Sequence, residues 1–115
     1  MTEHIRKRGQ AVEYMARDLL RERGYYVVRG SGKDDPVDMV AWRGFGGVLF
    51  VKAERQRTPL PTAAEAMERY RDRINMLRIM ERPPSSTVQI WIWNDQEGWR
   101  FFEVLPGGIV EVKEA

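Results

Sequence analysis

The stretch that decides the fold runs from Gly24 to Glu54 and reads GYYVVRGSGKDDPVDMVAWRGFGGVLFVKAE. It contains three apolar segments, and the second and third each carry one polar residue near the centre, Asp38 and Lys52. A charged side chain inside an apolar strand is costly unless it is paired, bound to a metal or placed in a wet cleft. We therefore expect Asp38 and Lys52 to belong to a polar site within a hydrophobic sheet.

Apolar periodicity predicts a helix followed by three strands in the first half of the chain. The helix is expected over Gln10–Arg23, and Gly24 is its expected stop because glycine readily adopts the conformation that ends helices. The strands are expected at Tyr25–Arg29, Val37–Trp42 and Val48–Glu54. The glycine-rich turn at 44–47 lies between the last two strands, which predicts a hairpin.

The second half predicts another helix and three more strands. Thr62 and Glu65 form a capping-box pattern that begins the helix, and the pair Pro83-Pro84 ends it. The strands are expected at Thr87–Trp93, Trp99–Val104 and Ile109–Val112. Because a helix separates the third and fourth strands, the sequence predicts an α/β fold with an αβββαβ core, in which helices flank a mixed central sheet and extra strands follow at the C-terminus.

The strand at Thr87–Trp93 is apolar on both faces, because Val88, Ile90 and Ile92 alternate with Trp91 and Trp93. Two interpretations of the aromatic residues here and in the next strand stay open. They cover a face of the sheet, or they contribute to a dimer interface. A platform on which bases stack is the less favoured alternative.

Length and composition indicate one folded domain over residues 1–115, of which 43% are hydrophobic. The chain has no cysteine and a single histidine, His4, so thiolate metal sites and serine–histidine catalysis are not expected. Any metal would be bound by oxygen, which favours Mg²⁺ or Mn²⁺. No apolar run approaches the ~20 residues of a membrane span, and the N-terminus lacks the core of a signal peptide, so we expect a cytoplasmic protein that does not contact a membrane.

Basic side chains are unevenly distributed along the chain. Residues 1–82 carry 17 basic and 12 acidic side chains, whereas residues 83–115 carry 2 and 5, and arginine outnumbers lysine 15 to 4. The planar guanidinium of arginine suits bidentate contacts with phosphate. Two interpretations are open from charge alone: a surface that binds nucleic acid, or an arginine-rich surface whose charges are solvated.

The order of elements, with certain residues on them, resembles the PD-(D/E)XK nuclease superfamily and, within it, the archaeal-type Holliday junction resolvases. The resemblance covers roughly residues 6–93 and implies a restriction-endonuclease-like fold. Each motif is weak alone, whereas the ordered set on the right elements is moderately specific. The motifs are Arg6-Lys7-Arg8-Gly9, Glu13, Gly24-Tyr25, Val27-Val28-Arg29, Gly30-Ser31-Gly32, Pro36-Val37-Asp38 and Val51-Lys52.

The resemblance implies catalytic roles for Glu13, Asp38 and Lys52, with Ser31 assisting. Hydrolysis of a phosphodiester needs a water that is deprotonated near neutral pH and a clamp on the charge of the transition state. A Mg²⁺ or Mn²⁺ ion would serve both needs, held by Asp38, by Glu13 and by a backbone carbonyl near Val51. Taken singly, these residues have simpler interpretations: an Asp38–Lys52 ion pair, a solvated Glu13 and a turn residue at position 31.

Phe50 departs from the pattern, because it occupies the position of the glutamate in the Glu-X-Lys motif. A phenyl ring cannot bind a metal. Strand alternation places Glu54 on the same face as Phe50 and Lys52, so Glu54 is one candidate for a relocated catalytic carboxylate. Two other outcomes stay open: Asp38 and Glu13 suffice for one weakly held ion, or cleavage is lost and DNA binding is kept.

Two functions follow from the resemblance. The first is a metal-dependent endonuclease that acts on branched or structured DNA as a homodimer, because cutting a junction needs two symmetric nicks. The second is a catalytically impaired or inactive homologue that binds DNA or serves in assembly. In the first case, the expected phosphate contacts come from six basic residues. These are Arg6, Lys7, Arg8, Arg29, Lys33 and Arg55.

Overall fold

A computed structural model of the chain describes residues 2–30, 34–59 and 62–113, without the side chains of residues 2–10. Within these ranges the chain forms three helices and six strands. The elements are α1 (Thr2–Glu22), β1 (Tyr26–Arg29), β2 (Met39–Trp42), β3 (Val48–Arg55), α2 (Ala63–Arg69), α3 (Arg71–Ile79), β4 (Ser86–Asn94), β5 (Gly98–Leu105) and β6 (Gly108–Val112). The predicted α/β fold class is confirmed, including the C-terminal strands.

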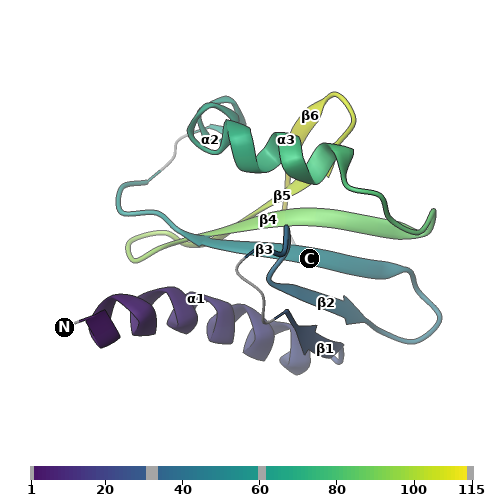
Figure 1. Cartoon of the computed structure of the whole chain (residues 1–115), viewed down its shortest axis with the longest axis horizontal. Helices are drawn as coiled ribbons and strands as arrows, with labels where there is room; N and C mark the ends of the chain where they lie inside the picture. The colour runs from purple at the N-terminus through teal and green to yellow at the C-terminus, as the bar shows by residue number, and fades with distance from the viewer. Residues whose placement is uncertain (1, 31–33, 60–61, 114–115) are drawn as a thin grey trace.

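The strands form one sheet in the order β1-β2-β3-β4-β5-β6. Strands β3 and β4 are parallel, and every other neighbouring pair is antiparallel, so the sheet is mixed as predicted. The helices α2 and α3 connect the two parallel strands, because such strands need a long crossover. They lie on one side of the sheet and α1 lies on the other (Figure 1).

Each face of the sheet packs against its helix through a separate apolar layer. The layer on the α1 side contains Leu20 of the helix together with Met39, Val51 and Trp91 of the sheet. The layer on the side of α2 and α3 contains residues of those helices and of β4, β5 and β6. Its buried members are Ala66, Ile74, Leu77, Val88, Ile90, Ile92, Phe102 and Val104.

The predicted alternation along β4 is confirmed by these layers, since Val88 and Ile90 face α3 whereas Trp91 faces α1. Trp91 also makes edge-to-face contacts with Trp99 and Phe101, at centroid distances of 5.6 and 4.7 Å. Of the open interpretations, the aromatic residues therefore cover a face of the sheet.

The second helical region differs from its prediction. Thr62 is the N-cap, as the capping-box pattern predicts, and its hydroxyl accepts a hydrogen bond from the backbone N–H of Glu65 at 3.2 Å. The sequence predicts one helix from there to Pro83, but two helices meet at Tyr70 (φ −112°, ψ 28°). The side chain of Tyr70 is half-buried and donates a hydrogen bond to Gln56 in the loop after β3. This hydrogen bond favours a break between the two helices at Tyr70, which the spacing of apolar residues does not reveal.

The first helix is also longer than predicted, since α1 begins at Thr2 rather than at Gln10. The polar segment before Gln10 has no apolar stripe of its own, so periodicity does not mark it. In the described part of the chain, no helix is both long enough and apolar enough to cross a membrane.

Gly47 lies where the chain enters β3, next to the segment that leads into β4. A Cβ atom at Gly47 would overlap the carbonyl oxygen of Ser85, and that backbone cannot move without shifting β4. We expect Gly47→Ala to lower the free energy of unfolding by about 1–3 kcal/mol, measured by urea denaturation. Gly107→Ala is the matched control, because a Cβ there meets no atom within 4 Å. An equal effect of the two substitutions would contradict the close approach.

Candidate active site

A cleft of about 300 Å³ lies where α1, the start of β2, the end of β3 and α3 meet. The sequence predicts that Glu13, Asp38, Lys52 and Glu54 belong to one site, and all four line this cleft. They come from separate parts of the chain: Glu13 from α1, Asp38 from the residue before β2, and the other two from β3. Arg73 of α3 completes the polar wall.

Asp38 and Lys52 form the centre of the cleft. Their side chains are only 15% and 13% exposed. Lys52 Nζ donates to both carboxylate oxygens of Asp38, at 3.2 Å to Oδ1 and 3.0 Å to Oδ2, and the backbone N–H of Ala53 donates to Oδ2 at 2.7 Å. The carboxylate therefore has three hydrogen-bond contacts, which compensate for the water it has lost.

The backbone of Asp38 is also held by β3. Its N–H donates to the carbonyl oxygen of Val51 at 2.9 Å. The side chain of Val51 is fully buried on the α1 side. The carbonyl that the sequence offers as a metal ligand thus already accepts a hydrogen bond between β2 and β3.

Phe50 lies in the apolar layer under α2 and α3 rather than at the cleft. It is half-buried against the cluster that contains Val88, its neighbour in β4. On its other side it pairs with Val40 of β2. Phe50 is not among the residues that line the cleft, so its ring belongs to the core and supplies no group to the cleft.

Glu54 contacts Lys52 in its own strand and Arg73 of α3. Its Oε1 atom is buried, 3.2 Å from Lys52 Nζ and 3.0 Å from Arg73 Nε. Neither contact has the geometry of a hydrogen bond, so both are electrostatic. Burial raises the pKa of Tyr70 to about 12, and the nearby charge of Glu54 adds to this shift. Glu54 is therefore engaged by two cations, Lys52 and Arg73.

Glu13 is a cleft carboxyl that interacts with Asp38. Burial raises the pKa of Glu13 above its ordinary value, and the charge of Asp38 and a hydrogen bond with it raise it further. Arg29 opposes this shift, with Nη2 at 3.5 Å from Glu13 Oε2. The guanidinium of Arg29 also lies over the ring of Tyr14, at 4.3 Å from its centroid. Glu13 and Asp38 thus form a carboxyl pair beside a packed arginine.

The donors in the cleft do not fit a divalent ion as they stand. Both oxygens of Asp38 are engaged by Lys52, Glu54 is engaged by Lys52 and Arg73, and Phe50 supplies no oxygen. Among the described residues, no three or more aspartate, glutamate, histidine or cysteine side chains gather closely enough to hold a metal ion. The Mg²⁺ or Mn²⁺ ion that the resemblance implies therefore stays a prediction, and so does the role of Glu54 as a relocated carboxylate.

The other predicted site residues are placed less centrally. Ser31 and Lys33 lie outside the described residues, as do the side chains of Arg6, Lys7 and Arg8. Arg55 lies at the rim of the cleft and pairs with Asp95 at 2.8 Å. Arg29 is engaged by Glu13 and Tyr14, so it supports the cleft wall rather than standing free in solvent.

Arg73 is the cleft residue that the sequence did not reveal. In sequence it is one of several arginines at helical spacing, which predicts an exposed, salt-bridged helix. Its neighbour Arg71 fits that prediction, since it pairs with Glu68 on the same surface. The local sequence does not distinguish Arg73 from the other arginines of the helix, because its role depends on how α3 packs over β3.

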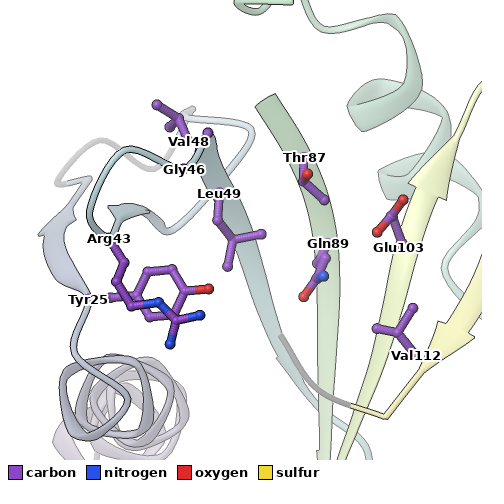
Figure 2. Close-up of a pocket in the computed structure, with 10 residues that line it drawn as sticks. Tyr25, Arg43, Gly46, Val48, Leu49, Thr87, Gln89, Glu103 and Val112 are labelled. Atoms are coloured by element: carbon purple, nitrogen blue, oxygen red, sulfur yellow. The ribbon is translucent and has the colours of Figure 1, made fainter. Parts of the chain in front are cut away.

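A second cavity, of about 340 Å³, lies on the α1 side of the sheet beyond the end of that helix (Figure 2). Figure 2 shows Arg43 and Tyr25 together on one wall and Glu103 on the strand at the other side. Leu49 and Gln89 lie between them. It shares no lining residue with the first cleft and contains none of the predicted site residues.

Glu13→Gln tests the carboxyl pair without any metal or substrate. A raised pKa means that folding favours the neutral form of Glu13, so this stabilisation is present below the ordinary carboxyl pKa and is lost as pH rises through the raised value. Glutamine stays neutral throughout. At pH 8 we expect Glu13→Gln to have a higher melting temperature than the natural chain. The difference in melting temperature should vanish toward pH 4. Glu22→Gln, an exposed change on the same helix, is the control. A lower melting temperature of Glu13→Gln at pH 8 would contradict the pair.

No protein-family model matches the chain, and a search of curated proteins finds no match. Among solved structures, the chain is similar to Hjc, a Holliday junction resolvase from the archaeal hyperthermophile Archaeoglobus fulgidus. The TM-score is 0.55 at 20% sequence identity, over 84% of this chain and 73% of that chain. The two proteins therefore share a fold, in which helices flank a mixed sheet of the resolvase type.

Proposed function

We propose that this protein binds branched or otherwise structured DNA as a homodimer, and that its nuclease-type cleft has lost efficient metal-dependent cleavage. The observation that carries the proposal is the state of the cleft. Asp38, Lys52 and Glu13 converge there, whereas Phe50, at the position where the resemblance implies a second metal carboxylate, packs in the core. The resolvase fold of the solved structure supports a DNA ligand.

The charges support binding through the DNA backbone. The excess of basic side chains lies in residues 1–82, which include every residue of the cleft. Arg73 is half-exposed at the cleft wall, with Arg55 beside it at the rim. Guanidinium groups favour phosphate oxygens. The sequence offers no zinc module or recognition helix, so selectivity would come from the shape and deformability of the DNA.

The cleft contacts argue against efficient hydrolysis. Cleavage needs a group that activates water and a clamp for the negative charge of the transition state. Lys52 is committed to Asp38 and lies beside Glu54, and Asp38 accepts from both Lys52 and Ala53. Lys52 and Asp38 are thus paired with each other rather than available to the reaction.

The second candidate function is the metal-dependent endonuclease of the Holliday-junction-resolvase type, with Mg²⁺ or Mn²⁺ as cofactor. One observation favours it: Glu13 and Asp38 lie close enough for burial and mutual repulsion to raise the pKa of Glu13. A pair of carboxyl groups in this state is stabilised by an added cation. This candidate requires Asp38 to release Lys52.

A cleavage and binding assay separates the two candidates. The protein is incubated with a four-way junction, a flap and a linear duplex, with Mg²⁺, with Mn²⁺ and with a chelator. We expect salt-sensitive binding that prefers the junction, is unchanged by the chelator and is not followed by cutting. Cutting that needs the metal and disappears in Asp38→Ala would favour the endonuclease. Equal affinity for all three DNAs would contradict the proposed preference.

Arg73→Ala tests the role of the cleft in DNA binding. If Arg73 contacts a phosphate, the slope of log affinity against log salt should fall by about one. Arg71→Ala is the matched control, since it removes the same charge from an exposed position of α3. The cleft is not the binding site if both substitutions change the slope equally.

Phe50→Glu tests whether Phe50 is the reason why efficient cleavage is lost. It places a carboxylate two residues before Lys52, where the Glu-X-Lys pattern has one, and we expect Mg²⁺-dependent cutting to rise at least ~10-fold above the natural chain. Phe50→Gln is the control, because it has the same shape without the charge and loses the same packing. Equal cleavage by the natural chain and Phe50→Glu, with both folded by circular dichroism, would show that the missing carboxylate does not limit the reaction.

A further inference from the structure

The cavity beyond the end of α1 has walls of different chemical character (Figure 2). Tyr25 and Arg43 form one wall, and Glu103 of β5 lies on the other side, with Leu49 and Gln89 between them. Its volume of about 340 Å³ is within the range of small-molecule sites, roughly 300–1,000 Å³. The polar groups on its two sides therefore indicate which kind of molecule it fits.

Gln89 and Glu103 present an amide and a carboxylate side by side. They pair directly across β4 and β5, so their side chains are neighbours on one face of the sheet. Gln89 is buried, and its Oε1 atom accepts a hydrogen bond from Trp91 Nε1 at 2.7 Å. An indole N–H can only donate, so this contact fixes the amide and leaves its NH₂ group for the cavity. No hydrogen bond or ion pair within the described residues engages that NH₂ group or the carboxylate of Glu103.

Arg43 gives the opposite wall a positive charge. Its guanidinium lies over the ring of Tyr25, at 4.6 Å from the centroid, and Nη1 donates to the carbonyl oxygen of Arg23 at 2.9 Å. These two contacts hold the side chain, whereas most of its five N–H donors have no partner in the described part of the chain. A guanidinium held in this way is suited to an anion, and its planar fork matches phosphate.

We propose that this cavity binds a guanine nucleotide. The Watson–Crick edge of guanine carries two adjacent N–H donors, at N1 and N2, next to the acceptor O6. A carboxylate accepts from both donors and an amide NH₂ group donates to O6, which is the pattern that Glu103 and Gln89 present. In this arrangement the phosphate lies toward Arg43, and Leu49 and Tyr25 contact the flat base. Adenine offers the pair one donor group rather than two, so it binds more weakly.

Two sources supply this chemistry: a nucleotide free in solution, or a nucleotide within DNA whose base is turned out of the stack. The first source does not depend on the proposed function. The second rests on it, and it adds a contact to a base where binding otherwise depends on shape and backbone. The cavity shares no lining residue with the cleft, so variants of the cavity leave the cleft residues unchanged.

Isothermal titration calorimetry of the natural protein tests the cavity with GMP, AMP and guanosine. We expect GMP to bind with a dissociation constant on the order of 10–100 μM. AMP should bind at least ~10-fold more weakly, because it lacks the second donor. Guanosine should also bind more weakly than GMP, because it lacks the phosphate.

Two variants assign these preferences to side chains. Glu103→Gln keeps the shape but replaces one acceptor oxygen, so we expect at least ~10-fold weaker binding of GMP and no preference over AMP. Arg43→Gln should bind GMP no better than guanosine. Glu81→Gln, an exposed change just after α3, is the matched control and should bind GMP as the natural chain does. Circular dichroism checks that each variant folds.

Competition with DNA distinguishes the two sources. A single strand of dT residues with one dG is added to the GMP complex, and a strand with one dA in its place is the control. Displacement of GMP by the dG strand alone assigns the cavity to a nucleotide within DNA, and no displacement by either strand assigns it to a free nucleotide. Equal displacement by both strands would contradict the recognition of guanine.

Two further outcomes overturn the inference: a natural protein that binds GMP no better than AMP, or a folded Glu103→Gln variant with the natural affinity for GMP. Junction binding measured in parallel separates this failure from failure of the proposed function. A protein that binds GMP but not the junction supports the cavity and removes the function. A protein that binds the junction but not GMP does the reverse.

Discussion

The carboxylate of Asp38 and the ammonium group of Lys52 are held together at the junction of β2 and β3, and the cleft depends on this pair. Both side chains are largely buried, so either one alone would leave an uncompensated charge in a low-dielectric environment. The N–H of Ala53 and the carbonyl of Val51 bind the side chain and the backbone of Asp38. The pair therefore fixes where β2 begins, and Glu13 and Glu54 both interact with it.

The absence of a carboxylate at position 50 limits what such a pair can do. In a site with a further carboxylate, an ion could draw Asp38 away from Lys52. Here Phe50 adds apolar area to the α3 layer instead, and Arg73 balances Glu54 from above the sheet. The remaining acid, Glu13, responds to Asp38 by a raised pKa. The charges of the cleft side chains thus nearly cancel one another. This balance is consistent with the proposed binding of DNA phosphates and poor activation of water.

Much of the architecture follows from apolar periodicity. The predicted strand Val48–Glu54 matches β3 within one residue, and Thr62 caps its helix because hydroxyl capping is a local interaction. The break at Tyr70 depends instead on a hydrogen bond to Gln56, which only the folded chain brings near. The same limit applies to the site. Strand alternation placed Glu54 on the face of Lys52, but it could not show that Arg73, from another element, contacts Glu54.

Direct measurement of Mn²⁺ binding tests the central claim, which is that the cleft keeps its nuclease-type pair without a metal site. Mn²⁺ is titrated into the protein at pH 7.5, and bound ion is followed by the loss of its free electron paramagnetic resonance signal. The account predicts no site tighter than ~1 mM in the natural chain, and a new site in Phe50→Glu that is lost when Asp38→Asn is added. Stoichiometric binding to the natural chain at micromolar Mn²⁺, abolished by Asp38→Asn, would contradict it.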